Sequence, residues 1–581
     1  MNEVVRMSAV TVVKNQMLVV KDQLICSSST KNSRPRHPVI CRVPIIREPR
    51  RTSMEFDYVI VGAGSAGCVL ANRLSADPSV RVCLLEAGSE DTSPLIHAPI
   101  GVAAILPTRH VNWALQTVPQ PGLMGRHGYQ PRGKTLGGSS SINGMIYNRG
   151  HRSDYDDWQA LGNPGWSYDD VLPYFRKSEG HHLGGSPFHG GEGELHVGRV
   201  QPHAVTNAFL DAAGQAGHQR NADFNGAEQE GVGHYDVTIH DGRRWSAAAA
   251  FLKPIRELRG NLTVITGAHA QRILLQGKRA VGMQVSLKGE RLEIRARREV
   301  LLSAGAFASP QLLMLSGIGA QSELKPQGIA LHHELPGVGQ NLQDHPDIVA
   351  CYKSHDTSLL GISASGTVKM GKAFVEYARH KTGPFASNCA ESGGFLKTSQ
   401  ELPRPDIQLH AVIGPIDDHG RKLHWGHGFS CHVCVLRPKS VGSVGLHSAD
   451  PFAPPRIDPN FLGHDDDVGT LLKGYRMVRE IVGQSPLARY GLKDLYGSDL
   501  ASDEQLIELL RRRTDTVYHP VGTCKMGSDE MAVVDNQLRV HGIEGLRVVD
   551  ASIMPTLIGG NTNAPTIMIA ERAAEWIRAA Q

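Results

Sequence analysis

The stretch FDYVIVGAGSAGCVLANRLS (residues 56–75) decides how this chain folds. Its first part, Tyr58–Val61, is an apolar run typical of a buried strand, and apolar residues recur at helical spacing after the glycines. Between strand and helix, Gly62, Gly64 and Gly67 fit the pattern G-x-G-x-x-G. The first glycine permits a tight turn, the second lets the backbone approach a pyrophosphate, and the third lets the helix pack on the strand. The stretch therefore predicts a nucleotide-binding turn of the Rossmann type.

A second strand and an acidic residue follow at the spacing that this turn requires. RVCLLEAG (81–88) is typical of a strand and contains Glu86, which lies 24 residues after Gly62 (86 − 62 = 24). At about this distance a carboxylate meets the ribose hydroxyls of a dinucleotide. The same carboxylate would repel a ribose 2′-phosphate, which argues against NADP. The pattern alone leaves NAD and FAD open.

Bulk composition limits the classes of protein to consider. At 581 residues the chain exceeds a usual single core, so two domains are expected. Hydrophobic residues make up 40% and charged residues 20%, the balance of a globular protein. The net charge of +4 does not describe the main part of the chain, because residues 1–54 hold ten Lys and Arg against three Asp and Glu. The remainder is nearly neutral, which gives no reason to expect nucleic acid.

The first 54 residues differ in character from the rest. CSSSTKNSRPRHPVICRVPIIREPRRTS (26–53) is rich in Ser, Arg and Pro and poor in acids, as organelle transit peptides are. Two interpretations stay open: a cleaved presequence, or a start codon assigned upstream of a true Met54. A transit peptide would direct the protein to a mitochondrion or plastid. Otherwise we expect the cytoplasm or the periphery of an inner membrane, because no apolar run reaches the roughly 18 residues of a membrane span.

Cysteines and histidines raise the question of a metal. Nine cysteines, an odd number, do not form a disulfide framework and suit a reducing compartment. Cys431 and Cys434 form a CxxC within an expected strand, with no second pair, so we interpret them as buried thiols. HGRKLHWGHGFSCH (419–432) contains four histidines but no accompanying carboxylate pattern on a helix. We therefore expect loop and strand histidines and no metal.

Five further segments carry a family resemblance. They are PRGKTLGGSSSINGMIYNRG (131–150), GAFASPQLLMLSGIG (305–319), NLQDHP (341–346), HPVGTCKMG (519–527) and VVDASIMPTLIGGNTNAPTIMIAERAAEWI (548–577). In this order they resemble the signatures of the glucose–methanol–choline (GMC) flavoprotein oxidoreductases. The resemblance spans roughly residues 55–577 and implies FAD as the cofactor. Within the family the chain looks most like bacterial quinone-linked dehydrogenases of primary aliphatic alcohols, and choline dehydrogenases look like close relatives.

The resemblance extends the nucleotide site along the whole chain. Together with the glycine pattern, it assigns FAD binding to Gly62, Gly64, Ser65, Ala66, Gly67, Glu86, Ala87, Thr135, Gly138, Ser139, Asn143, Gly144, Met145, Ile146, Ala270, Asp550, Ala551 and Pro565. Some members of the family attach FAD covalently through a histidine in the 138–146 loop, where this chain has Ile142. We therefore expect FAD to be bound without a covalent link. The last helix is expected to begin near Pro565, with its positive end toward the flavin.

Two residues are predicted to carry the chemistry. Oxidation of an alcohol needs a base for the hydroxyl proton, and a neutral imidazole, with an ordinary pKa of about 6.5, suits this task. The resemblance implies that His519 is this base. It also implies that Asn563, at the start of the last helix, is its partner and holds the substrate oxygen.

We expect an α/β protein in which a doubly wound, Rossmann-type FAD domain is interleaved with a substrate domain built on an antiparallel sheet. Residues 55–350 would form mainly the FAD domain, 351–504 mainly the substrate domain, and 505–581 a catalytic segment that returns to the FAD domain. Loops 92–110 and 385–395 would set substrate choice, and their small and apolar residues favour an aliphatic chain. Glu391 is left open between a cage for the choline cation and a structural hydrogen-bonding role.

The predicted function is oxidation of a primary aliphatic alcohol to the aldehyde, with hydride passing to flavin N5 and electrons to quinone or another acceptor. The first alternative is choline dehydrogenase and the second an alcohol oxidase. A third alternative is a relative without this redox chemistry, such as a hydroxynitrile lyase or a light-driven fatty-acid decarboxylase. The resemblance to the decarboxylases is weakened by His519, because those enzymes lack the base histidine. Peripheral membrane association follows from the quinone-linked resemblance alone, and the oligomeric state stays open.

Overall fold

A computed structural model describes residues 19–20, 23–24 and 54–580. The chain divides into two compact units, Met1–Thr52 and Ser53–Gln581. In the first unit, β1 (Val19–Val20) pairs with β2 (Gln23–Leu24) in antiparallel fashion. The transit-peptide interpretation rests on residues that lie almost entirely outside the described part.

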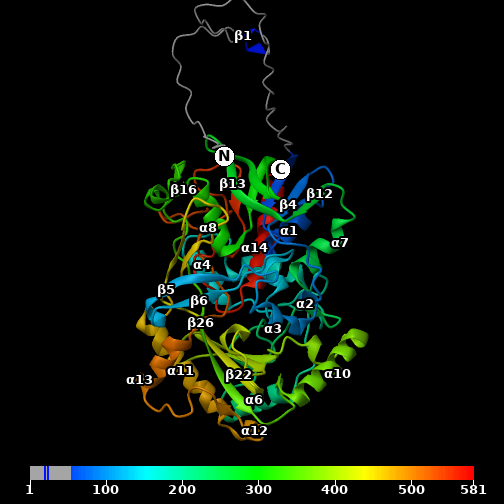
Figure 1. Ribbon diagram of the computed structural model, residues 1–581, viewed down its shortest axis with the longest axis vertical. Coiled ribbons are helices and arrows are strands. Elements are labelled where there is room, and N and C mark those ends of the chain that lie inside the picture. The colour runs from blue at the N-terminus through cyan, green and yellow to red at the C-terminus, as the bar shows by residue number, and fades with distance from the viewer. Residues whose placement is uncertain (1–18, 21–22, 25–53, 581) are drawn as a thin grey trace, which may run out of the picture. The chain divides into compact units, whose positions relative to one another are not determined.

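The predicted nucleotide-binding strand lies within a seven-stranded mixed sheet. Its strands are β3 (Met54–Val61), β4 (Val82–Glu86), β12 (Leu262–Thr266), β13 (Ala268–Gln276), β14 (Arg279–Leu287), β15 (Glu290–Leu302) and β27 (Leu546–Val548). β3 pairs in parallel with β4 on one side and β15 on the other, and β12 extends the parallel part beyond β4. β14 and β13 continue from β15 as antiparallel strands. The sheet occupies the upper half of Figure 1.

The last helix packs against the first helix of this sheet. α1 (Ser65–Leu74) follows the glycine turn, as predicted, and α14 (Asn563–Ala579) begins two residues before Pro565. Arg73 of α1 reaches Glu571 of α14 at 2.6 Å, and the side chain of Glu571 is fully buried. Because a buried carboxylate is costly without a paired cation, this contact fixes how the two helices meet. The last helix is thereby held along α1, the helix that follows the glycine turn (Figure 1).

A second sheet of eight strands carries the expected antiparallel architecture. Its strands are β9 (Gly231–His234), β18 (Pro346–Ser354), β19 (Gly361–Ile362), β20 (Ser392–Leu396), β21 (Ile407–Ile413), β22 (Gly426–Val435), β25 (Lys493–Asp494) and β26 (Asp515–Thr516). All its pairings are antiparallel. β9 and β26 come from outside 351–504, so strands from distant parts of the chain complete this sheet. It occupies the lower half of Figure 1.

Helices cover both sheets. Besides α1 and α14, those of at least nine residues are α4 (Arg152–Ala160), α5 (Tyr168–Ser178), α6 (Ala204–Gln215), α8 (Gly305–Leu315), α10 (Ala364–His380), α11 (Asp465–Val482) and α13 (Asp503–Arg513). α6 and α11 contribute to one apolar core with strands of the second sheet. Among the described residues, no helix combines the length and apolar character needed to cross a bilayer.

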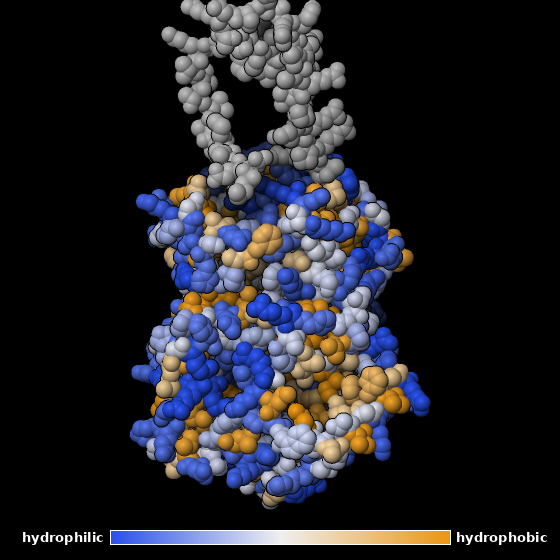
Figure 2. Space-filling view, viewed as in Figure 1, coloured by the Kyte–Doolittle hydropathy of each residue, from blue (hydrophilic) through white to orange (hydrophobic). Residues whose placement is uncertain are grey.

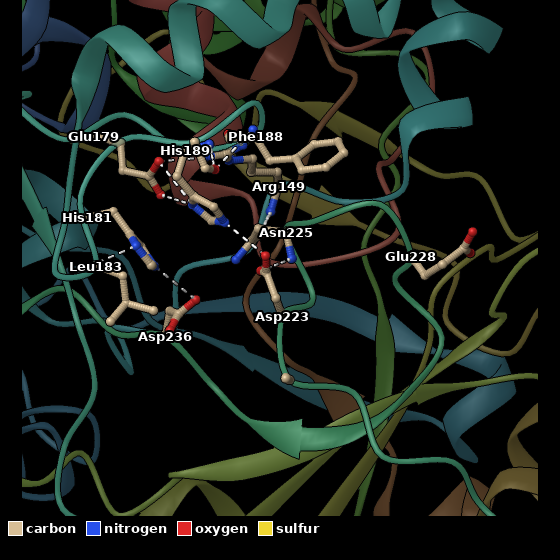
Figure 3. A network of polar contacts seen from close by, with 12 residues as sticks. Arg149, Glu179, His181, Leu183, Phe188, His189, Asp223, Asn225, Glu228 and Asp236 are labelled. Carbon is tan, nitrogen blue, oxygen red and sulfur yellow. Dashed lines mark hydrogen bonds and ion pairs between the residues drawn. The ribbon is translucent and has the colours of Figure 1, made fainter.

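A buried polar network ties the segment after the 138–146 loop to its surroundings (Figure 3). Arg149 donates to Glu179 at 2.7 Å, and His189 lies between Glu179 at 3.1 Å and Asp223 at 3.0 Å. Burial opposes a charged imidazole, but hydrogen bonds to Asp223 and Glu179 outweigh it and raise the pKa of His189 to about 9. His189 is therefore an imidazolium at neutral pH, held between two carboxylates.

Candidate active site

A single large cavity collects most of the predicted site residues. Its volume is about 1340 Å³, and its walls come from segments of both sheets and from the loops between them. Nearly all residues assigned to FAD line it, as do His519 and Asn563. Those assigned to FAD that do not line it are Gly67, Thr135 and Pro565. A cavity of this size has room for a dinucleotide and a small substrate together.

The glycine turn forms one end of the cavity. Gly62 has φ +100°, which favours glycine, and a Cβ atom on Gly67 would lie 1.9 Å from the Gly62 carbonyl oxygen. A Cβ atom on Gly64 would instead meet nothing within 4 Å. Gly64 caps α1 without any side-chain hydrogen bond, so the first backbone N–H groups of the helix have no side-chain cap. This end of the cavity therefore fits the pyrophosphate of FAD.

Glu86 lies at the same end, at the tip of β4. Its carboxylate accepts hydrogen bonds from the backbone N–H of Gly88 at 2.7 Å and of Ala63 at 3.0 Å. Burial nevertheless raises the pKa of Glu86 to about 7. Both Glu86 and Ala87 line the cavity. The position agrees with the predicted contact to ribose, which stays a prediction.

The 138–146 loop lies directly against the glycine turn. Gly138 has φ +53°, and a Cβ atom there would come within 2.7 Å of the Gly64 Cα atom. Asn143 is held by Arg244, whose guanidinium donates to the Asn143 side-chain oxygen at 2.7 Å. Gly144 leaves open space in front of its backbone. The loop thus presents backbone, with little side-chain bulk, to the cavity, as a flavin ring would require.

Ile142 points into a small apolar cluster with Ile96 and Ile105. An isoleucine offers no nucleophile for a covalent bond to a flavin. This supports the expectation of dissociable FAD, which stays a prediction. Ser139 and Met145 flank this position and line the cavity.

The remaining FAD assignments occupy the cavity edge or support it. Ala270 lies on β13 at a point where the pairing with β14 is irregular. It lines the cavity. Asp550 accepts hydrogen bonds from the Gly305 N–H at 2.8 Å and the Ser309 hydroxyl at 2.5 Å. Thr135 donates to the Ser89 carbonyl and so holds the loop from behind, while Pro565 is buried within the first turn of α14. Ala551 and Ile146 complete the lining.

His519 is placed by a strained turn. The preceding residue, Tyr518, has φ +76°, which is uncommon for a residue with a side chain. Asp344 stabilises the turn, because its two carboxylate oxygens accept from the His519 N–H at 2.9 Å and the Thr516 hydroxyl at 2.6 Å. Arg132 donates to the Tyr518 carbonyl at 2.9 Å. Backbone strain held in this way is typical of functional positions.

A second histidine determines which nitrogen of His519 carries its proton. His345 Nε2 lies 3.1 Å from the Ile558 carbonyl oxygen, which can only accept, so this nitrogen donates. In the neutral ring, His345 Nδ1 must then accept, and its partner at 3.0 Å is His519 Nδ1. The proton of His519 therefore lies on Nδ1, and Nε2 keeps its lone pair. His345 belongs to the segment NLQDHP, from which no role for this histidine is predicted.

Both rings are neutral at physiological pH. Burial, followed by the neighbouring His345 and His410, holds the pKa of His519 well below its usual value. Burial lowers the pKa of His345 and of His410 to about 3. His519 is thus available as a base, since its lone pair is not already occupied by a proton.

The amide beside His519 is that of Asn561, whereas the sequence predicts Asn563 at this place. Asn561 Nδ2 lies 3.2 Å from His519 Nε2, and its side-chain oxygen accepts from Gln408 of β21 at 3.1 Å. Asn563 instead accepts from the Ser65 hydroxyl at 2.7 Å, toward the glycine turn. Asn563 is the first residue of α14 and contacts Ser65 of α1, whereas Asn561 lies in the preceding loop. The sequence GGNTNAP contains both, and only tertiary contacts distinguish them.

Apolar side chains form part of the cavity wall, together with aromatic rings and histidines such as Trp113, Tyr518, His410 and His419. The apolar residues include Leu106, Leu360, Met370, Val412, Ile413 and Val517. The acidic residues that line the cavity are Glu86 and Asp550, both among the FAD assignments. Glu391 is not among the lining residues, because its carboxylate accepts from the His203 N–H at 2.6 Å and the Ser387 hydroxyl at 2.7 Å. Of its two open interpretations, this geometry favours the structural one.

The histidines and cysteines that suggested a metal have other partners. In the 419–432 segment, His424 contacts Asp417, His427 contacts Ser363, and His432 contacts Asp347. Cys431 and Cys434 are buried and free, and they pack into different apolar clusters on opposite faces of β22. A strand places residues three apart on opposite faces, so this CxxC does not converge on one ion.

One other group among the described residues has the composition of a metal site. Single ligand atoms of His181, His182 and Asp236 lie within 4.8 Å of one another. However, the Leu183 N–H donates to His181 Nδ1, which leaves the proton of the neutral ring on Nε2 (Figure 3). Arg199 also donates to Asp236 at 2.9 Å. The arrangement therefore favours an ion-pair cluster over a metal centre.

Comparison with known proteins gives consistent matches. Family models described as GMC oxidoreductase match residues 56–347 and 438–570. An alcohol dehydrogenase [acceptor] of Pseudomonas putida is 48% identical over 527 residues, which cover 90% of this chain and 95% of the relative. The mitochondrial choline dehydrogenase of Homo sapiens is 46% identical over 538 residues, 90% of each chain.

Solved structures resemble the same described architecture. Pyridoxine 4-oxidase from Mesorbium loti superposes with a TM-score of 0.81 at 33% identity, covering 90% of this chain and 99% of the other. An Aspergillus oryzae RIB40 formate oxidase whose title refers to FAD modification gives a TM-score of 0.84 at 29% identity and covers 91% and 99%. The two-sheet architecture predicted from the sequence is therefore confirmed.

Proposed function

Because the chain belongs to the GMC oxidoreductase family and is an FAD-dependent oxidoreductase acting on CH–OH donors, we propose that its substrate is a primary aliphatic alcohol. The product would be the aldehyde. The electrons would pass to a quinone or another acceptor that is not oxygen. The name of the relative from Pseudomonas putida, alcohol dehydrogenase [acceptor], supports the last point.

The observation that carries the substrate proposal is the apolar wall next to His519. An aliphatic chain gains roughly 0.8 kcal/mol for each CH₂ group that it buries on such a wall. These apolar side chains themselves offer neither the aromatic face nor the carboxylate that recognises a trimethylammonium group. Glu391, the one acid considered for that role, is satisfied by structural hydrogen bonds. This favours alcohols over choline, although choline dehydrogenases are among the similar proteins.

The chain's own residues supply proton transfer and orientation. His519 Nε2 would accept the hydroxyl proton, while its Nδ1–H continues to donate to His345 and stabilises the imidazolium that forms. One amide N–H of Asn561 donates to His519 Nε2 in the absence of substrate, and the amide would donate to the substrate oxygen as negative charge develops there. Gln408 fixes the amide so that its N–H groups face the cavity. When bound, FAD supplies the acceptor for the hydride that leaves the substrate carbon.

The test is anaerobic stopped-flow of the yellow protein against ethanol, hexanol, decanol and choline. Flavin absorbance at about 450 nm is followed as the cofactor is reduced. We expect rapid bleaching with hexanol or decanol and slow bleaching with choline. Rapid bleaching with choline alone would replace the proposal by choline dehydrogenase. Full-length protein that binds FAD but bleaches with none of the four would contradict alcohol oxidation.

His519→Ala provides the matched control for the chemical step. It should retain bound FAD, because His519 lies at the substrate end of the cavity, and lose roughly 100- to 10,000-fold in the rate of flavin reduction. Repeating the turnover assay with oxygen and with a soluble quinone then distinguishes the oxidase alternative. Turnover that is fastest with oxygen would overturn the acceptor part of the proposal.

A further inference from the structure

Six large apolar side chains are exposed together on one face of the molecule. They are Ile362, Val368, Phe374, Val375, Leu423 and Trp425, here called the rim patch. Leu423 is 74% exposed and Trp425 is 71% exposed. Hydrophobic surface gathers over α10 in the lower right of Figure 2. Contiguous exposed apolar residues, unlike scattered ones, mark surfaces that contact another apolar phase.

The patch is continuous because β19 joins its two parts. Ile362 of β19 pairs with Gly426 and bridges to Trp425. Helix α10 begins at Ala364, two residues after Ile362, and Ser363 at its N-cap also contacts His427. The loop that carries Leu423 and Trp425 is therefore held next to the start of α10.

Helix α10 directs its larger apolar residues outward. Its buried residues are Gly366, Ala373 and Tyr377. Val368 and Val375, seven residues apart, share a face that points away from this buried side. A helix normally turns its large apolar residues toward the core and its small or polar ones toward water. The reverse arrangement in α10 indicates that its outer face is built for an apolar surrounding.

Basic residues flank the apolar face. α10 contains Lys369, Lys372 and Arg379 with one acidic residue, Glu376. Lys422 adds a further cation next to Leu423. An amphipathic helix with lysines beside its apolar face, together with an exposed tryptophan, is the pattern of helices that lie in a membrane interface. Such cations are attracted to an anionic lipid surface.

The rim patch borders the cavity that contains His519. Ile362, Leu423 and Met370 of α10 all line this cavity. We propose that the rim patch docks on the surface of a phospholipid bilayer that carries anionic headgroups. Docking there brings the part of the cavity that Ile362, Leu423 and Met370 line next to the lipid. Long-chain alcohols and lipid-soluble acceptors then enter the cavity from the membrane. Only this route of entry rests on the proposed function; the docking itself does not.

Vesicle co-sedimentation of the full-length FAD-loaded protein tests docking. We expect binding to vesicles of phosphatidylcholine with phosphatidylglycerol and weaker binding to phosphatidylcholine alone. V375S/W425S removes two apolar side chains that do not line the cavity and should weaken binding by roughly tenfold or more. K369E/K372E should reduce binding to the anionic vesicles selectively. L183S/L258S, at two residues that are 76% and 83% exposed outside the rim patch, is the matched control and should bind as the unchanged protein does.

Three outcomes would overturn the proposal. The first is no binding of the unchanged protein to anionic vesicles, and the second is equal binding by V375S/W425S. The third is a dimer in light scattering that V375S/W425S dissociates, which would assign the patch to a second copy of this chain. Bleaching of V375S/W425S by ethanol without vesicles should match the unchanged protein. If no alcohol bleaches the flavin yet vesicle binding depends on the patch, the proposed function fails and the docking surface stands.

Discussion

At the scale of single residues, the base of the proposed reaction depends on a histidine that is distant in sequence. His345 holds the proton of His519 on Nδ1 because its own Nε2 is committed to the Ile558 carbonyl. Neither ring needs a carboxylate partner, since burial already keeps both neutral. His345 is therefore a positioning residue: it acts on the substrate only through His519.

Replacing His345 should separate positioning from packing. His345→Gln keeps an oxygen to accept from His519 Nδ1–H and an amide N–H to donate to Ile558, so we expect most of the activity to remain. His345→Phe keeps the ring but offers neither group, and flavin reduction should slow by roughly 10- to 100-fold, less than in His519→Ala. Stopped-flow reduction and its pH profile measure both effects. Equal rates for the two variants at every pH would contradict the positioning role.

Asn561 and Asn563 give a second test at this scale. Asn561→Ala removes the amide beside His519 and should slow flavin reduction by roughly 100-fold with little change in FAD content. Asn563→Ala removes the contact to Ser65 at the glycine turn and should lower FAD affinity more than the chemical rate. FAD content and anaerobic reduction are measured on both. If instead Asn563→Ala slowed flavin reduction and Asn561→Ala lowered FAD affinity, Asn563 would be the partner of His519, as the sequence predicts.

These residues also indicate where sequence reasoning stops. His519 was predicted because a short motif identifies it, and the glycine turn because all its parts lie within 20 residues. Asn561 and His345 were missed because their roles depend on contacts across 42 and 174 residues. Gln408, which orients Asn561, lies on a different sheet from the nucleotide-binding strand. No local pattern in the chain encodes such a convergence.

At the scale of elements, the glycine turn and the polar network hold the cavity wall in place. The strand, turn and helix of 56–75 were predicted from the sequence because each element follows from its own residues. The network around His189 was not, because it joins the segment at Arg149 to Glu179 and Asp223 from separate loops. A substitution in the glycine turn should therefore affect FAD binding or stability, and one in the His189 network should affect the pH dependence of stability.

Two substitutions in the glycine turn should affect folding and cofactor binding separately. Gly67→Ala places a Cβ atom 1.9 Å from the Gly62 carbonyl, so the cofactor-free protein should lose stability. Gly64→Ala meets nothing within 4 Å in the protein, but its methyl group enters the space predicted for the pyrophosphate. It should leave the melting temperature of the cofactor-free protein unchanged and lower FAD affinity. Thermal melts with and without FAD provide the measurement, and an unstable cofactor-free Gly64→Ala protein would contradict this division.

The His189 network should make stability depend on pH. The pKa of His189 is raised to about 9 in the folded protein, above its usual 6.5. Its contribution is therefore fully present below about pH 6.5 and is lost as pH rises through about 9. Glu179 and Asp223 have lowered pKa values, so their contributions are lost only in acid. His189→Gln should lower the midpoint of urea unfolding at pH 6 and much less at pH 10; an equal loss at both would contradict the charged imidazolium.

At the scale of the whole molecule, the cavity brings together parts of the chain that are far apart in sequence. The FAD assignments come from the glycine turn, the 138–146 loop, Ala270 of β13 and the segment at Asp550. The two sheets were expected, whereas the packing of α14 against α1 beside the cavity was seen only in the structure. A cofactor bound there would contact both halves of the chain, so we expect its loss to affect the stability of the entire unit.

FAD should therefore act as a ligand of the folded state. Removing it should lower the melting temperature, and adding it back at 100 times its Kd should restore about 2.7 kcal/mol. Because Ile142 offers no covalent bond, acid precipitation should release all flavin into the supernatant as fluorescent FAD. The control is the same precipitation of the His519→Ala protein, in which the cavity walls at the flavin are intact and which should release as much FAD. Yellow colour retained in the pellet would mean that FAD is covalently attached. A melting temperature that does not change with FAD would mean that FAD does not bind at the 138–146 loop.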